Sequence, residues 1–232
     1  MFSKNEWNPK IREFFLSDSY LERKELYENI EKNAKNFNGN TLDLGCGTKP
    51  YQHLFNCDSY VGLEINGGGI NDADYFYDGT VFPFKDEEFD NMVSFQVIYQ
   101  APNLNALISE MNRVLKLNGK VLITVPFIWF DGGGNMHRRF SEQYTKTKFE
   151  EYGFEIEKIE QTNSNLSALC ILSNKYINRS ISTIRFKLLR VFFRIFITPL
   201  FNLLGLLFLK FMKRDNELYI DTILLAKKVK SV

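Results

Sequence analysis

An acidic residue and two glycines end a short apolar run in the first quarter of the chain, in the stretch TLDLGCGTK at residues 41–49. Asp43 lies two residues before Gly45, and Gly47 follows two residues after that. Glycine has no Cβ and tolerates a positive φ, so a ligand can approach such a turn closely. A turn of this kind after the first strand of an open α/β sheet is a usual place for a nucleotide-like cofactor.

The acid and the residues after the turn narrow the choice of cofactor. A dinucleotide loop offers helix N–H groups to an anionic pyrophosphate, so a carboxylate is unfavourable there. The third glycine of a G-x-G-x-x-G loop is also absent, because Pro50 takes its place. A carboxylate suits an amine or a cation, and S-adenosylmethionine carries both an amino group and a sulfonium. The turn therefore favours this cofactor over a nicotinamide dinucleotide.

Strand and helix patterns alternate along the chain and predict an α/β fold. Helices are predicted at 20–36, 105–116 and 141–151, and strands after the glycine turn at 59–64, 75–77, 88–95, 119–126, 153–159 and 218–226. Ser141 is placed to cap the third helix, and Gly153 lies just past its end.

Four stretches carry a family resemblance, at residues 43–51, 61–64, 78–84 and 113–120. With them the chain resembles the class I S-adenosylmethionine-dependent methyltransferases. More closely, it resembles the small-molecule type of surface-polysaccharide and other cell-envelope pathways. The resemblance spans roughly residues 38 to 162 and resumes near 217. It implies a Rossmann-like seven-stranded sheet whose last strand is antiparallel.

The resemblance also implies roles for individual residues. Asp43 and the turn would hold the methionine and ribose part of the cofactor, Glu64 the ribose diol and Asp78 the adenine amine. The small Cys46 is expected to be structural. The full expected cofactor site is Asp43, Gly45, Cys46, Gly47, Glu64, Asp78, Gly79, Phe95 and Gln96.

The acceptor side departs from the family pattern. After the fourth strand the chain reads QVIYQ at 96–100, without the acid and histidine that relatives carry there. After the fifth strand Met136 stands where relatives have Asp. His137 is the candidate general base for an alcohol acceptor, because an imidazole titrates near neutrality. Arg139 could clamp a substrate phosphate or carboxylate, or form a structural ion pair.

The segment before the last strand is basic and apolar. Between Ser164 and Arg214 there are nine Lys or Arg residues and no Asp or Glu. The longest charge-free run, residues 195–209, is shorter than the ~20 residues of a membrane span. A single crossing would also separate the last strand from its sheet. The pattern predicts an interfacial helix, with Lys187, Arg190 and Arg194 as a basic stripe, broken at Pro199 and followed by a second apolar helix.

Residues 184–214 are thus expected to bind an anionic membrane surface, or else to bury against protein. The expected domains are an N-terminal helical region at 1–37, a methyltransferase domain at 38–163 and 216–232, and an amphipathic helical insert at 164–215. Three irregularly spaced cysteines and the absence of a signal pattern favour the cytoplasm, with peripheral attachment to the inner face of the cell membrane.

The function expected from these features is methyl transfer from S-adenosylmethionine to a small or lipid-linked molecule, with a sugar hydroxyl in cell-envelope glycan synthesis as the leading acceptor. A lipid or quinone-like acceptor and a non-catalytic cofactor-binding protein at the membrane remain alternatives. No metal is expected. No nucleic-acid partner is expected either, because the basic insert is strongly apolar. The sequence leaves the oligomeric state open.

Overall fold

The computed structural model of the 232-residue chain describes residues 8–67, 72–130, 138–214 and 217–232. The chain forms two compact units. The first contains Asn29–Glu160 and Asp221–Val232, and the second contains Glu6–Glu28 and Gln161–Ile220. In this division residues 8–28 group with residues 161–220.

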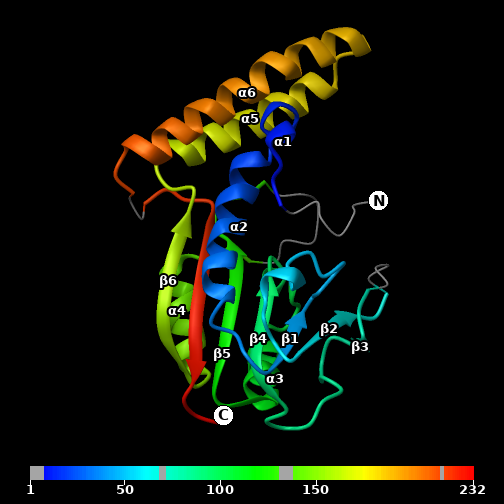
Figure 1. The fold of residues 1–232 in the computed structure, drawn as a ribbon, viewed down its shortest axis with the longest axis vertical. Helices are drawn as coiled ribbons and strands as arrows, with labels where there is room; N and C mark the ends of the chain where they lie inside the picture. The colour runs from blue at the N-terminus through cyan, green and yellow to red at the C-terminus, as the bar shows by residue number, and fades with distance from the viewer. Residues whose placement is uncertain (1–7, 68–71, 131–137, 215–216) are drawn as a thin grey trace. The chain divides into compact units, whose positions relative to one another are not determined.

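The first unit holds a seven-stranded sheet in the order β3-β2-β1-β4-β5-β7-β6 (Figure 1). Its strands are β1 (Asn40–Leu44), β2 (Ser59–Ile65), β3 (Tyr75–Tyr77), β4 (Phe89–Phe95), β5 (Leu115–Pro126), β6 (Phe154–Thr162) and β7 (Asp221–Lys228). Strands β1 to β5 pair in parallel, and β7 runs antiparallel to β5. The predicted sheet with an antiparallel last strand is confirmed.

Two helices of the first unit pack on this sheet, α3 (Leu104–Val114) on β5 and α4 (Glu142–Glu151) on β7. Short 3₁₀ turns lie at Gln52–Leu54 and Ile98–Gln100. The predicted cap of α4 is confirmed, since Ser141 Oγ accepts a hydrogen bond from the Tyr144 N–H at 3.2 Å. Gly153 follows the helix with φ of 78°, a conformation that favours glycine.

The helix predicted at 105–116 ends earlier than expected, at Val114. Leu115 is fully buried and pairs with Phe89 of β4, so it already belongs to the sheet. Burial of apolar side chains between sheet and helices forms the core of this unit, around Leu44, Met92 and Ile108. The core holds the carboxyl ends of the parallel strands in place, and these ends form one edge of the sheet.

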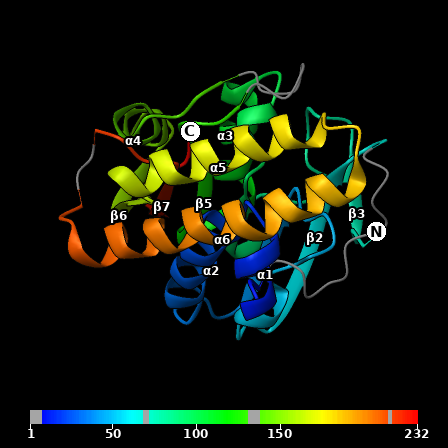
Figure 2. The same cartoon turned by 90° about the horizontal axis from the view of Figure 1, so that it is seen from above.

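The second unit is helical. It contains α1 (Ile11–Leu16), α5 (Leu166–Ser182) and α6 (Lys187–Phe211), and α2 (Tyr20–Ala34) begins in it and ends in the first unit. Helices α5 and α6 lie side by side and antiparallel, as a hairpin (Figure 2). The predicted helical insert before the last strand is therefore present.

The predicted break at Pro199 is wrong, because α6 continues through this residue. A proline inside a helix removes one hydrogen bond and costs ~3 kcal/mol. Contacts with α5 on both sides of the proline offset this cost. Asn178 Nδ2 donates to Thr198 Oγ1 at 3.1 Å, and Asn174 Nδ2 donates to Asn202 Oδ1 at 3.3 Å.

Two residues of the expected basic stripe on α6 have partners within the hairpin. Arg190 Nη1 donates to the Ser182 carbonyl at 3.4 Å, and Arg194 Nη2 donates to the Ser182 Oγ at the same distance. Ser182 ends α5, and cations are favourable at the carbonyl end of a helix. These two side chains therefore stabilise the turn of the hairpin as well as adding charge to its surface.

Candidate cofactor site

The glycine turn lies directly after β1, at the carboxyl edge of the sheet. Gly45 and Gly47 have φ of 72° and 51°, in the region that disfavours residues with a Cβ. The Gly45 N–H donates to the Leu63 carbonyl of β2 at 2.8 Å, which fixes the turn against the neighbouring strand. A Cβ added to Gly45 would lie 2.4 Å from both methyl carbons of Val97. The turn therefore requires glycine for both backbone conformation and space.

Asp43 lies just before this turn with its side chain buried, at 2% exposure. The Tyr60 hydroxyl donates to Asp43 Oδ2 at 2.8 Å. Burial raises the pKa of Asp43 to about 7, while the Tyr60 hydrogen bond and the charge of Lys49 act in the opposite direction. A buried carboxyl that titrates near neutrality at the edge of a sheet is typical of a functional position. A cationic ligand would stabilise the ionised form of Asp43.

Glu64 joins the end of β2 to the glycine turn. Its Oε2 accepts a hydrogen bond from the Gly47 N–H at 3.1 Å, and its Oε1 accepts one from the Ile65 N–H at 3.1 Å. The side chain is half-buried, so each oxygen keeps acceptor capacity toward the edge. The parallel register of β1 and β2 brings this carboxylate to the same end of the sheet as Asp43. Both expected acids thus lie at the edge that the sequence predicted for them.

A lysine–aspartate pair that was not predicted from the sequence lies beside the glycine turn. Lys49 Nζ pairs with Asp74, whose Oδ2 also accepts a hydrogen bond from the Gly62 N–H at 2.6 Å. A Cβ on Gly62 would lie 2.4 Å from Lys49 Cε and 2.6 Å from Cys46 Sγ. Because Gly62 has no side chain, both residues can pass over β2. No motif in this sequence signals the pair, because its members are 25 residues apart.

Cys46 is buried in this packing. Its pKa is raised to about 12, first by burial and next by the charge of Asp43. A thiol with so high a pKa is protonated at neutral pH and is a poor nucleophile. The expected structural role of Cys46 in the turn is consistent with this chemistry.

Asp78 and Gly79 follow β3. Asp78 is exposed, and its Oδ1 accepts hydrogen bonds from the Thr80 N–H at 2.8 Å and the Thr80 hydroxyl at 2.6 Å. These bonds to Thr80 hold the pKa of Asp78 below its usual value. Gly79 has φ of 93°. The pair forms a fixed turn after β3, with the Asp78 carboxylate ionised and open to solvent.

Phe95 is the last residue of β4, and Gln96 follows it. The Phe95 ring meets Tyr51 edge to face, with centroids 4.8 Å apart. Gln96 adopts φ of 59°, and its N–H donates to the Thr124 carbonyl of β5 at 3.0 Å. A non-glycine residue held in this region carries backbone strain, which is frequent at functional sites. The side chain of Gln96 reaches toward β7.

Asp221 is the residue that Gln96 meets, and no sequence motif indicated it. Gln96 Nε2 donates to Asp221 Oδ1 at 2.9 Å, and Asp221 is 2% exposed. An antiparallel strand begins where its parallel neighbours end, so the first residue of β7 reaches the carboxyl edge. Only the direction of the last strand could have indicated this residue from the sequence.

The expected acceptor residues are described only in part. His137 and Met136 lie outside the described residues. Arg139 is exposed, and its Nη1 donates to the Trp129 carbonyl at 2.6 Å. Arg138 Nη2 donates to the Pro102 carbonyl at 3.1 Å, which links the segment after β5 to the one after β4. Each guanidinium has a backbone partner.

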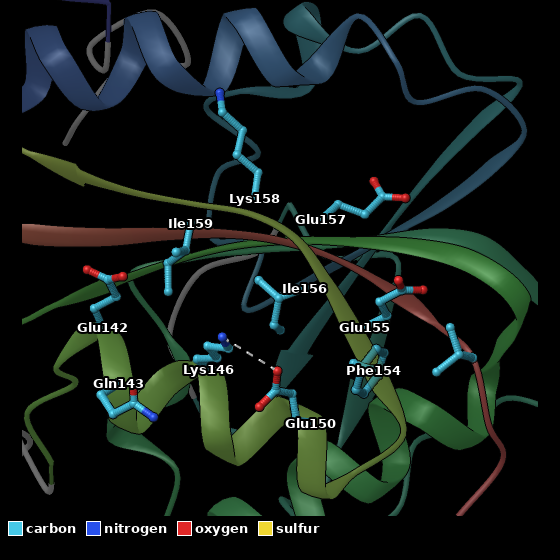
Figure 3. Close-up of a pocket in the computed structure, with 11 residues that line it drawn as sticks. Glu142, Gln143, Lys146, Glu150, Phe154, Glu155, Ile156, Glu157, Lys158 and Ile159 are labelled. Carbon is cyan, nitrogen blue, oxygen red and sulfur yellow. Dashed lines mark ion pairs between the residues drawn. The ribbon is translucent and has the colours of Figure 1, made fainter.

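A separate pocket of about 550 Å³ lies between α4 and β6 (Figure 3). Its lining is strongly charged, and Lys146 Nζ approaches Glu150 Oε1 at 4.0 Å within it. None of the expected cofactor residues lines this pocket. The acids that could hold a cofactor lie at the carboxyl edge of the sheet instead.

Comparisons with known proteins agree with this geometry. Residues 42–123 match a family model described as a methyltransferase domain. Two uncharacterised proteins of Methanocaldococcus jannaschii are similar, at 31% identity over 117 residues and 33% over 95 residues. The matches cover 48% and 38% of this chain, and the chain spans 54% and 37% of the length of these relatives.

Solved structures share the fold at low identity. The [4+2]-cyclase SpnF has a TM-score of 0.55 at 18% identity, over 89% of this chain and 80% of that one. Phosphoethanolamine N-methyltransferase 2 of Haemonchus contortus, solved with S-adenosylhomocysteine, has a TM-score of 0.55 at 14% identity, over 99% of this chain and 61% of that one. Residues 42–123 thus match a methyltransferase-domain model, and the chain shares the α/β fold of these solved structures.

Proposed function

We propose that the protein transfers a methyl group from S-adenosylmethionine to a hydroxyl of a small or lipid-linked sugar. The main observation in favour of methyl transfer is that buried Asp43 and half-buried Glu64 flank the glycine turn at the carboxyl edge of the sheet. Two carboxylates beside a backbone open to close approach suit a ligand that carries an ammonium, a sulfonium and a ribose. They do not suit the pyrophosphate of a dinucleotide.

The residues present fit this cofactor. Gly45 and Gly47 leave the backbone of the turn without a Cβ, and Glu64 presents acceptor oxygens for ribose hydroxyls. The ionised form of Asp43 favours a cation. When bound, the cofactor supplies an activated methyl group on its sulfonium. The contribution of the protein is to position the acceptor, and positioning can supply ~7–11 kcal/mol of the barrier.

The acceptor is inferred from the sequence resemblance to cell-envelope enzymes. A hydroxyl acceptor benefits from a base that takes its proton, and His137 remains the candidate for this role. Arg139 keeps further N–H donors beside its bond to Trp129, so it can still contact an anionic group on the substrate. The Gln96–Asp221 pair fixes a polar amide at the end of β4, where an acceptor would be oriented.

Two measurements test the proposal. In calorimetry we expect binding of S-adenosylmethionine and of its demethylated product, and no binding of NAD. The purified protein should then move label from methyl-labelled cofactor into sugar acceptors, both nucleotide-linked and lipid-linked. Partition between water and organic solvent separates the two classes of product. Tight binding of NAD without binding of S-adenosylmethionine would contradict the cofactor assignment.

A second function on the same fold is cofactor binding without methyl transfer. It is favoured by the changed acceptor segment at 96–100 and by the likeness in fold to a protein described as a [4+2]-cyclase. Fold alone does not determine the reaction. Cofactor binding without label transfer to any acceptor of the native cell extract would support this second function.

The state of Asp43 gives a pH prediction. A cationic cofactor binds the ionised carboxylate, so affinity should rise as the pH increases through about 7, the pKa of Asp43. Tyr60→Phe removes the hydrogen bond that lowers this pKa, and the midpoint of the affinity profile should therefore move to higher pH. Titrations between pH values of about 5.5 and 8 bracket this pKa and measure both profiles. Because the ligand titrates identically in both, coincident midpoints would contradict a contact between Asp43 and the cofactor.

A further inference from the structure

Helix α6 exposes a continuous apolar stripe. The stripe residues recur every three or four positions, which places them on one face of the helix. They are Leu188, Phe192, Phe196, Leu200, Leu203, Leu207 and Phe211, with exposures between 40% and 86%. The stripe extends for ~35 Å at 1.5 Å per residue. Large apolar patches of this kind on a soluble protein mark an interaction surface.

The opposite face of α6 is polar and buried. Thr198, Asn202 and Gly205 are its only buried residues among those described. Asn202 Nδ2 donates to the Phe14 carbonyl at 2.8 Å, and a Cβ on Gly205 would lie 2.3 Å from Leu21 Cδ1. Thr198 and Asn202 form, with Asn174 and Asn178 of α5, the polar seam, a line of hydrogen-bonded side chains along the interior of the hairpin.

On α6, polar or small residues inside and apolar residues outside reverse the usual arrangement of a helix in a water-soluble protein. Helices in lipid show this arrangement, because lipid does not drive apolar faces together and polar or small residues hold the interface. In the described chain α6 is also the one helix with the length and composition of a membrane span, with a mean hydropathy of 2.0 and 17% burial in its most apolar window.

The positive charge of the hairpin favours one kind of partner for the apolar stripe over another. Nine basic and no acidic residues lie between Ser164 and Arg214. Against a second copy of the chain, these charges would repel. Anionic lipid headgroups would attract them, at about 1 kcal/mol for each basic residue near the surface.

We propose that the α5–α6 hairpin binds the surface of an anionic bilayer, with the apolar stripe of α6 inserted among the acyl chains. The hairpin begins after β6 and ends before β7, which are neighbours in one sheet. If α6 crossed the membrane, α5 would have to cross it as well, so that β6 and β7 stay on the same side. Helix α5 carries Lys175 and Arg179, which makes such a crossing costly. A position along the surface leaves Lys175 in its ion pair with Glu22, keeps both charges out of the acyl chains and inserts only the stripe. This inference is independent of the proposed reaction.

Co-sedimentation with vesicles tests the proposal. We expect the full-length protein to sediment with phosphatidylcholine vesicles that contain phosphatidylglycerol, more weakly as salt increases, and to keep a salt-resistant fraction. The stripe variant Leu188→Glu/Phe192→Glu/Phe196→Glu should lose at least about tenfold in affinity at every salt concentration, since it removes inserted apolar side chains. Its matched control is Val81→Glu/Leu117→Glu/Val229→Glu, which adds the same charge at exposed apolar residues of the first unit and should bind like wild type.

A charge variant separates attraction from insertion. Lys187→Glu/Lys213→Glu leaves the hydrogen bonds of Arg190 and Arg194 to Ser182 intact, and neither lysine takes part in a salt bridge among the described residues. It should lower low-salt affinity about tenfold and leave the salt-resistant fraction unchanged. Circular dichroism and cofactor affinity verify that each variant is folded.

Two outcomes would overturn the proposal. One is wild-type protein that remains in the supernatant with anionic vesicles at low salt. The other is a stable dimer in lipid-free buffer that the stripe variant dissociates, because a second copy would then cover the stripe.

Discussion

Replacement of Asp43 by asparagine should weaken binding of S-adenosylmethionine by about tenfold or more. The loss of a charged hydrogen-bonding partner corresponds to roughly 1.5–3 kcal/mol, and the neutral amide of the variant cannot balance the charge of a cation. The Tyr60 hydroxyl can still donate to the amide oxygen, so the local packing is retained. Calorimetric titration about one pH unit above the pKa of about 7, where Asp43 is mainly ionised in the wild type, measures the difference. Equal affinity in the two proteins would refute the role of Asp43.

The same variant should be more stable than wild type at high pH in the absence of cofactor. The folded-state pKa of Asp43, about 7, lies above its ordinary value of 3.8 because burial disfavours the charge. Its contribution to stability is thus fully present below pH 3.8 and is lost as the pH rises through 7. Asp43→Asn removes this dependence. Between pH values of about 6 and 8, the unfolding temperature of the variant should therefore decrease less than that of wild type. A cooperative unfolding transition in the variant also excludes misfolding as the cause of weak binding.

A second large effect is expected for Gly45→Ala. The new methyl group would lie 2.4 Å from the Val97 methyl carbons, and the residue would need φ of 72°. Either Val97 or the turn must move, and both lie beside the expected position of the cofactor. We expect cofactor affinity to fall by more than about tenfold, together with a lower unfolding temperature.

Gly67→Ala is the matched control for this variant. Gly67 has φ of 85°, but a Cβ there would meet no atom within 4 Å. Both variants carry the cost of a left-handed alanine, roughly 1–2 kcal/mol, and only Gly45→Ala adds a collision. If the two variants bind cofactor equally well, the space over Gly45 is not part of the site.

The sequence predicted the sheet well because its signals are local. Strands between turn residues and one amphipathic helix are visible in windows of about ten residues, and the Asp43 turn carries its chemistry within about five. The residues that were missed depend on contacts distant in sequence. Asp221 lies 125 residues from Gln96, and Lys49 lies 25 residues from Asp74. Neither pair has a motif, and each follows only from the strand order.

The error at Pro199 has a different cause. The local rule for proline is correct in water-exposed helices, but here α5 provides hydrogen bonds on both sides of the residue. The rule could not include these bonds, since Asn174 and Asn178 look like ordinary polar residues until the hairpin is formed. The bond of Arg190 to Ser182 was not predicted for the same reason, because Ser182 becomes a neighbour of Arg190 only through the turn between the helices.

The polar seam of the hairpin also determines the register of its two helices. A slide of α6 along α5 by one turn would move Asn202 by about 5.4 Å relative to Asn174. The hydrogen bond between the amides of Asn174 and Asn202 would then be broken, and a buried amide without a partner costs about 1–3 kcal/mol. A directional pair of this kind specifies one alignment among many that hydrophobicity alone would allow. The hairpin can therefore keep the same alignment whether water or lipid surrounds its outer face.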